Sequence, residues 1–143
     1  IKHSRVAKSN LFGLQKLGAE VTMFAPETLI PKGIDQLGAK LCSSREEALD
    51  GADVVMGLRI QRERQQKGLF PSVAEYCDNW EITPERVALA KKHALVMHPG
   101  PMNRGVEIAS SAADSAQSVI NQQVESGVAV RMALLYMLTR REA

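Results

Sequence analysis

Hydrophobic residues follow two alternating patterns along this chain. Residues 4–18 carry apolar side chains at the spacing of one helix face, namely Val6, Ala7, Leu11, Leu14 and Leu17. We expect a helix there that begins after Ser4 as its cap and ends at Gly18. By contrast, residues 54–56 and 94–97 form short continuous apolar runs, which are typical of parallel strands covered on both faces.

Shorter signals predict the remaining elements. Ser44 and Glu47 form a capping-box pattern, which predicts a short helix ended by Gly51. Thr83 followed by Pro84 predicts a helix that runs to about residue 93. The other expected elements are strands at 20–24, 40–42, 53–57 and 94–97, a long loop at 58–70, a helix or an irregular turn at 73–80, a helix at 115–126 ended by Gly127, and a final apolar helix at 128–140.

Strands that alternate with helices predict an α/β fold with a doubly wound parallel sheet, a three-layer α/β/α Rossmann-like domain. The length of 143 residues fits one ordinary domain. Ligands of this fold bind beyond the carboxyl ends of the strands. That rule selects three polar segments that should meet at one edge of the sheet, residues 3–5, 58–61 and 98–101.

Composition narrows the function classes. The net charge is only +2, so nothing in it favours nucleic acid as a partner. The longest apolar run, residues 128–138, contains Arg131 and is shorter than the ~20 residues of a membrane helix. Cys42 and Cys77 lie far apart, as reduced cysteines of a cytoplasmic protein do. The cysteines and histidines have no metal-ligand spacing, so we expect neither a metal site nor a cofactor.

Arg59 and Gln61 are the first candidate ligand-binding residues. They lie two positions apart after an expected strand, so in extended backbone they point the same way while Ile60 points into the core. A guanidinium can bind a carboxylate through two charge-assisted hydrogen bonds, and Gln61 can donate a third. The alternative is a surface arginine on a charged loop, because residues 62–64 are also charged.

Arg5 and the turn at residues 98–101 are the other candidates. Arg5 lies in the first turn of a helix, where the dipole disfavours a cation unless an anion binds there; projection into water is the alternative. Pro99 and Pro101 around Gly100 fix the backbone path and leave carbonyls to accept hydrogen bonds, although a rigid loop without a ligand is the simpler interpretation. His98 is either a general base or a structural histidine.

Together these segments resemble the aspartate carbamoyltransferase family of the bacterial type. The resemblance is carried, in the family's order, by residues 3–10, 58–64 and 98–108, which read HSRVAKSN, LRIQRER and HPGPMNRGVEI. Lys8 is a departure, because arginine is usual there. The resemblance implies that carbamoyl phosphate and L-aspartate are joined to give N-carbamoyl-L-aspartate and phosphate, an early step of pyrimidine biosynthesis.

The resemblance also implies roles for individual residues. Arg5 and Arg59 would hold the two carboxylates of aspartate, with Gln61 beside them. Gly100 and Pro101 would lie against carbamoyl phosphate, and the peptide bond before Pro101 would be cis. Ser4, His98 and Pro99 would support these residues. No residue of the chain is expected to be catalytic in the strict sense.

The other half of the family's site has no counterpart in this sequence. Its Ser-Thr-Arg-Thr phosphate cradle and His-Pro-Thr-Gln segment are absent, and the chain opens at Ile1 without an initiator methionine. We therefore expect residues 1–143 to be an aspartate-binding domain cut from a longer chain and inactive alone, with the helix at about 128–140 packed on the missing carbamoyl-phosphate domain. Full-length chains would form a homotrimer, with or without regulatory or dihydroorotase subunits.

Three alternatives stay open. Ornithine carbamoyltransferase shares the fold, but it has His-Cys-Leu-Pro where this chain has His98-Pro99-Gly100-Pro101, and paired arginines suit a dicarboxylate better. A dinucleotide-binding domain would need a Gly-x-Gly-x-x-Gly loop after a strand, which the sequence lacks. A non-catalytic partner module on the same fold is the third, because fold alone does not determine function.

Overall fold

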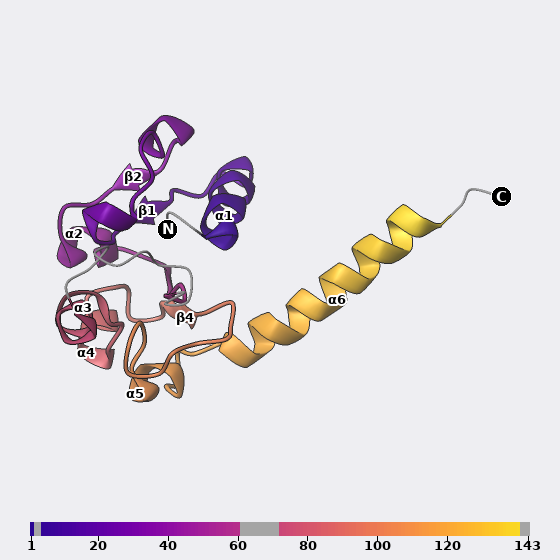
Figure 1. Ribbon diagram of the computed structural model, residues 1–143. Coiled ribbons are helices and arrows are strands. Elements are labelled where there is room, and N and C mark those ends of the chain that lie inside the picture. Colours follow the sequence, from indigo (N-terminus) through magenta and orange to yellow (C-terminus); the bar gives the residue numbers. More distant parts are fainter. Residues whose placement is uncertain (2–3, 61–71, 141–143) are drawn as a thin grey trace.

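The computed structural model describes residues 1, 4–60 and 72–140 (Figure 1). The regular elements are, in order, α1 (Arg5–Lys16), β1 (Thr22–Met23), the 3-10 turns η1 (Glu27–Leu29) and η2 (Asp35–Leu37), β2 (Lys40–Leu41), α2 (Arg45–Leu49), β3 (Val54–Met56), α3 (Val73–Trp80), α4 (Pro84–Val87), β4 (Leu95–Met97), α5 (Ser110–Ala113) and α6 (Ile120–Thr139).

All strand pairs of the described residues are parallel. β1 pairs with β2, with Thr22 opposite Lys40, and β3 pairs with β4, with Val55 opposite Val96. The strands form two two-stranded sheets. Parallel strands linked by helices confirm the expected α/β Rossmann-like fold, although the backbone pairing is divided between two short sheets instead of running through one.

Each sheet has its own hydrophobic core. In the first, Leu11 of α1 packs with Met23 of β1 and with Ile34. The second is built around Val96 of β4 and Ile108, both with no exposed surface. Because β4 contributes Val96 to this core and β3 pairs with β4, the loops that follow these strands start from fixed points.

The expected helix starts are confirmed in most details. Ser4 caps α1, since its hydroxyl accepts from the amide of Ala7 at 3.1 Å, and Ser44 caps α2 by accepting from Glu47 at 3.1 Å. The capping box itself is altered, because the Glu47 carboxylate accepts from the backbone N–H of Ser43, at 2.9 Å, in place of Ser44. Residues 73–80 form a helix capped by Ser72, which decides between the two expected structures.

Two expected helices end or begin elsewhere, and tertiary pairing explains both corrections. The helix that starts at Pro84 ends at Val87 and not near residue 93, because the chain must turn to pair with β3, as the bond from Lys91 N–H to the Ala52 carbonyl shows at 3.1 Å. The helix expected at 115–126 is absent over residues 115–119, where Val96 exchanges backbone bonds with Gln117 and Val119.

Gly127 does not separate two helices. α6 runs without interruption from Ile120 to Thr139. A glycine inside an exposed helix costs only about 1 kcal/mol relative to alanine, so the helix-forming sequence on both sides of Gly127 prevails.

α6 projects away from the rest of the molecule (Figure 1). Ile120 at its start is buried, but large apolar side chains farther along are exposed, among them Val128, Val130, Met132, Leu134, Leu135, Tyr136, Met137 and Leu138. Over the residues that the structure describes, no helix combines the length and apolar character needed to cross a membrane.

Candidate functional site

One cleft of about 940 Å³ brings together the three polar segments that the sequence singled out. Its lining includes Ser4 and Arg5 at the start of α1, Leu58, Arg59 and Ile60 after β3, and Pro99, Gly100 and Pro101 after β4. Of the expected site residues, Gln61 lies outside the described residues. The common cleft at the strand ends is the arrangement expected for a ligand site of an α/β fold.

Arg5 contributes a positive charge at one wall of the cleft. Its side chain is exposed, and α1 has no acidic residue in its first turn. Ser4 holds the helix start in place through its bond to Ala7. Because the helix dipole adds a partial positive charge at the same point, this wall favours an anion.

Arg59 contributes a second guanidinium from the segment that follows β3. β3 ends at Met56, and the bond from the Gly57 amide to the Met97 carbonyl, at 2.9 Å, continues the pairing with β4. Ile60 is buried, with 5% of its surface exposed, while Arg59 is half-buried in the cleft wall. The alternation expected from extended backbone is therefore confirmed for these two residues.

The turn after β4 has the expected unusual backbone. The Gly100–Pro101 peptide bond is cis, and Gly100 has a φ of +64°, which a residue with a side chain rarely adopts. The amide of Gly100 donates to Nδ1 of His98 at 3.0 Å. This bond holds the turn against the end of β4, so that Pro99, Gly100 and Pro101 face the cleft together.

His98 itself is fully buried and is not among the residues that line the cleft. Its backbone N–H donates to the side-chain oxygen of Gln123 at 2.9 Å, and its Nε2 lies 3.3 Å from Oε1 of Glu107. A histidine in this position supports the turn and has no path to a bound substrate. The geometry thus favours the structural interpretation over a general base.

Sequence reasoning missed Glu107 and Asn103 as individual residues. Glu107 is 2% exposed, and its carboxylate accepts from both the backbone and the side chain of Asn103. Burial alone raises the pKa of Glu107, but hydrogen bonds from His98 and Asn103 outweigh it and hold the pKa below its usual value. The only sequence signal was a glutamate between Val106 and Ile108, which by itself does not distinguish a buried acid from an exposed one.

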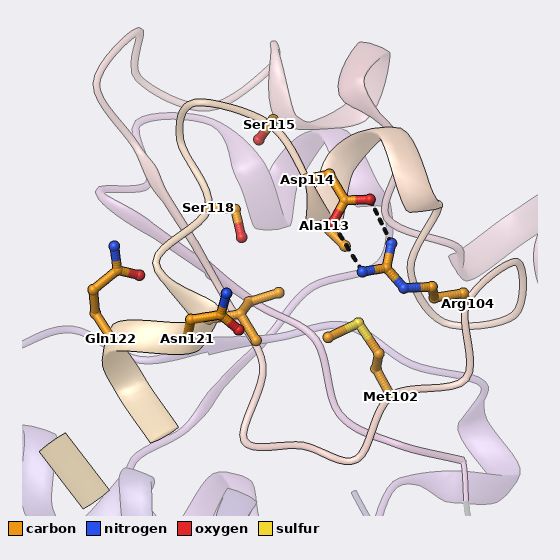
Figure 2. A pocket seen from close by; sticks show the side chains of 9 residues that line it. Met102, Arg104, Ala113, Asp114, Ser115, Ser118, Asn121 and Gln122 are labelled. Carbon is orange, nitrogen blue, oxygen red and sulfur yellow. Dashed lines mark hydrogen bonds and ion pairs between the residues drawn. The ribbon is translucent and has the colours of Figure 1, made fainter. Parts of the chain in front are cut away.

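A second cavity, of about 320 Å³, lies beside α5 and the start of α6 (Figure 2). Arg104 and Asp114 face each other at its edge through two hydrogen bonds of 2.7 and 2.8 Å. These bonds lower the pKa of Asp114 and occupy the Arg104 guanidinium. The charged groups at the edge of the second cavity are therefore paired with each other.

Comparisons with known proteins agree on one family. The family model described as aspartate/ornithine carbamoyltransferase, Asp/Orn binding domain, matches residues 2–138. The aspartate carbamoyltransferase catalytic subunit of Moorella thermoacetica is 62% identical over 96% of this chain and 45% of its own length, and that of Acetivibrio thermocellus is 58% identical over 100% and 46%. The chain thus spans a little under half the length of these relatives.

Solved structures show the same fold. Ornithine carbamoyltransferase from Thermus thermophilus superimposes with a TM-score of 0.78 over 94% of this chain and 45% of its own, at 19% identity. An aspartate transcarbamoylase from Trypanosoma cruzi, in complex with carbamoyl phosphate, gives a TM-score of 0.65 over 81% of this chain and 39% of its own, at 25% identity.

Proposed function

The chain belongs to the aspartate/ornithine carbamoyltransferase family as its Asp/Orn-binding domain, and on that premise we propose that it is the aspartate-binding half of an aspartate carbamoyltransferase. In the proposed reaction the amine of L-aspartate attacks the carbamoyl carbon of carbamoyl phosphate. A C–N bond forms, the C–O bond to phosphate breaks, and N-carbamoyl-L-aspartate and phosphate leave. This is a step of pyrimidine biosynthesis.

One observation carries the proposal: the guanidinium-bearing residues Arg5 and Arg59, 54 positions apart in the sequence, line the same cleft. Two arginines can each bind one carboxylate, and L-aspartate has two. We assign Gln61 a place beside them from the sequence. Gly100 and Pro101, on the adjoining wall, would lie against carbamoyl phosphate, with Ser4, Pro99 and His98 supporting these residues.

Catalysis in this proposal depends mainly on holding two substrates together. Fixing the amine close to the carbamoyl carbon turns a bimolecular encounter into a step within one complex. Charge on the departing phosphate must also be neutralised, which needs donors at the phosphate oxygens. We assign those donors to a carbamoyl-phosphate domain of a longer chain.

The alternative substrate, ornithine, is less well matched to the cleft. Ornithine carries one carboxylate and a side-chain amine, so a second arginine would face a positive charge. Two relatives at 62% and 58% identity are named aspartate carbamoyltransferase, whereas the structural likeness to an ornithine enzyme at 19% identity carries the fold alone.

We also propose that the exposed apolar part of α6 packs on the carbamoyl-phosphate domain of the full-length enzyme. Support comes from the large side chains exposed on that helix, such as Leu138 at 82%, and from relatives about twice as long as this chain. Those relatives are named catalytic subunits, which supports a larger assembly. We infer a cytoplasmic homotrimer, with or without regulatory or dihydroorotase subunits; both cysteines are free thiols.

The test is a substrate comparison in the full-length enzyme. Carbamoyl phosphate is supplied with L-aspartate or with L-ornithine, and carbamoylated product and released phosphate are measured. The proposal expects product with aspartate and none above background with ornithine. Product with ornithine but not with aspartate would contradict it, and so would the absence of product with both amino acids.

A further inference from the structure

We propose that Glu107 is a positioning residue that couples the two substrate-binding segments of the cleft. It acts through His98 on the Gly100–Pro101 turn and through Asn103 on the backbone next to Arg59. The inference rests on the proposed function, because that function assigns the two segments to carbamoyl phosphate and to aspartate. Glu107 does not line the cleft, so its effect on substrates must be indirect.

The first arm of the coupling runs through His98. Its Nδ1 accepts the N–H of Gly100 at 3.0 Å, and a nitrogen that accepts carries no proton, so in the neutral ring the proton resides on Nε2. Nε2 lies 3.3 Å from Oε1 of Glu107. The negative carboxylate thus lies beside the protonated nitrogen of the ring and favours, by its charge, the tautomer that leaves Nδ1 able to accept from Gly100.

The second arm runs through Asn103. Its side-chain nitrogen donates to Oε2 of Glu107 and to the carbonyl of Ile60, both at 3.1 Å. Its backbone N–H donates to Oε1 of Glu107 at 2.5 Å. Both amide hydrogens thus bind acceptors, and one of those acceptors is the carbonyl of the residue that follows Arg59.

The glutamate at the centre is itself fixed by the fold. The backbone carbonyl of Glu107 accepts from the Ile82 amide at 3.0 Å, and the next residue, Ile108, belongs to the second hydrophobic core with no exposed surface. A buried carboxylate is costly unless hydrogen bonds satisfy it. Here Asn103 donates to both oxygens, and Nε2 of His98 lies 3.3 Å from Oε1. Disturbing Asn103 or His98 should therefore affect the segment to which that residue leads.

Gly57 adds a close steric contact to the same assembly. A Cβ placed on it would lie 3.1 Å from the His98 ring and 3.1 Å from the Ile82 side chain. The strand that leads to Arg59 therefore packs directly on the imidazole that holds Gly100. The two segments share a rigid support, which a loop held only by its own residues would lack.

The two arms predict separable effects on the two substrates. In the full-length enzyme, Asn103→Ala should raise the KM for aspartate about tenfold or more, measured at saturating carbamoyl phosphate, because the backbone beside Arg59 loses its tie. The dissociation constant of carbamoyl phosphate, measured calorimetrically without aspartate, should stay within about twofold. Glu107→Gln should raise both constants.

Two substitutions of His98 test the other arm, because one of them should recover part of the loss that the other causes. Gln in place of His98 can reach the Nε2 position but loses the acceptor for Gly100, so His98→Gln should weaken carbamoyl phosphate binding about tenfold or more. Asn keeps an acceptor near the Nδ1 position, so His98→Asn should recover part of that loss. A histidine that only filled space would show no such difference between the two variants.

Two surface variants serve as matched controls. Asn79→Ala removes a half-buried amide whose bond in the described residues, to the Glu75 carbonyl, stays within α3, and Glu85→Gln neutralises an acid at the start of α4. Both should leave the two constants within about twofold. Thermal midpoints of all variants separate loss of positioning from loss of folding, and the Asn103 and His98 variants carry the test if Glu107→Gln does not fold.

Unchanged constants, or equal changes for both substrates in the Asn103 and His98 variants, would overturn the assignment of Glu107 as the common support of two separate arms while leaving the proposed function intact. If the unsubstituted full-length enzyme makes no carbamoyl-aspartate, the proposed function fails and this inference fails with it.

Discussion

The cleft and α6 differ in whether their side chains find partners within the chain. Around the cleft, the buried carboxylate of Glu107 finds its partners within the chain: it accepts two hydrogen bonds from Asn103 and lies 3.3 Å from Nε2 of His98. Along α6, large apolar side chains such as Leu134 and Leu138 remain more than half exposed. The comparison teaches that this chain by itself brings Arg5 and Arg59 to one cleft, whereas the apolar side chains of α6 stay exposed in the described residues and, in our proposal, are covered by another domain.

The largest expected effect is on turnover itself. The purified chain alone should form no carbamoyl-aspartate above background, because our proposal assigns the donors for the phosphate of carbamoyl phosphate to another domain. Product is measured by colorimetric assay with the full-length enzyme as positive control. Steady product formation by the chain, free of host enzyme, would show that the cleft catalyses the reaction without the proposed carbamoyl-phosphate domain.

The next effect concerns Arg59. In the full-length enzyme, Arg59→Ala should lower kcat/KM for aspartate by about 10- to 150-fold, which corresponds to about 1.5–3 kcal/mol for hydrogen bonds to a charged group. Arg59→Lys should not restore it, because an ammonium lacks the planar fork. Arg104→Ala, which breaks an exposed ion pair outside the cleft, is the matched control. Equal losses in the Arg59 and Arg104 variants would remove Arg59 from the site.

A smaller effect should distinguish the full-length enzyme from the isolated chain when α6 is substituted. Leu134→Ser and Leu138→Ser should destabilise the full-length enzyme by about 1.5–3 kcal/mol each if the side chains are buried there. In the isolated chain the same changes should shift the thermal midpoint little, since both residues are already exposed. Similar shifts in the two forms would argue against an interdomain role for α6.

The smallest expected effect is the contribution of Glu107 to the pH dependence of folding stability. Its pKa is lower in the folded chain than the ordinary 4.5, so the unfolded state takes up its proton first as the pH falls. Glu107 therefore stabilises the fold above its unfolded pKa, and this contribution is lost as the pH falls through the folded pKa. Its neighbours in the structure include His98, Asn103 and Tyr76.

Thermal unfolding of the chain between pH 7 and pH 3 measures this contribution. The thermal midpoint of Glu107→Gln should fall less steeply below about pH 4.5 than that of the unsubstituted chain. Glu125→Gln, at an exposed position of α6, is the control and should leave the slope unchanged. Parallel curves for the unsubstituted chain and Glu107→Gln would exclude a stabilising role for this carboxylate.

Much of the fold could be predicted where local signals and tertiary contacts agree. Ser4 begins α1 as expected because a cap acts on the amides of its own first turn. The apolar runs at residues 54–56 and 95–97 became β3 and β4 as expected, but only Val55 and Val96 are buried while Val54 and Leu95 are exposed, so the expectation that both faces are covered was wrong. The predicted helix ends near residue 93 and at Gly127 were wrong. Strand pairing ends the first helix at Val87, and the second continues through Gly127 because the sequence on both sides forms a helix.

The sequence by itself determined the residue types at three places: an arginine at the start of a helix, an arginine after one strand, and a glycine between two prolines after another. Helix caps, apolar periodicity and turn residues act over a few positions, so they can be read without coordinates. Only the tertiary structure decided that Arg5 and Arg59 share one cleft and that Glu107 is buried between His98 and Asn103. Such contacts join residues far apart in the chain, and their energy depends on burial that no local pattern records.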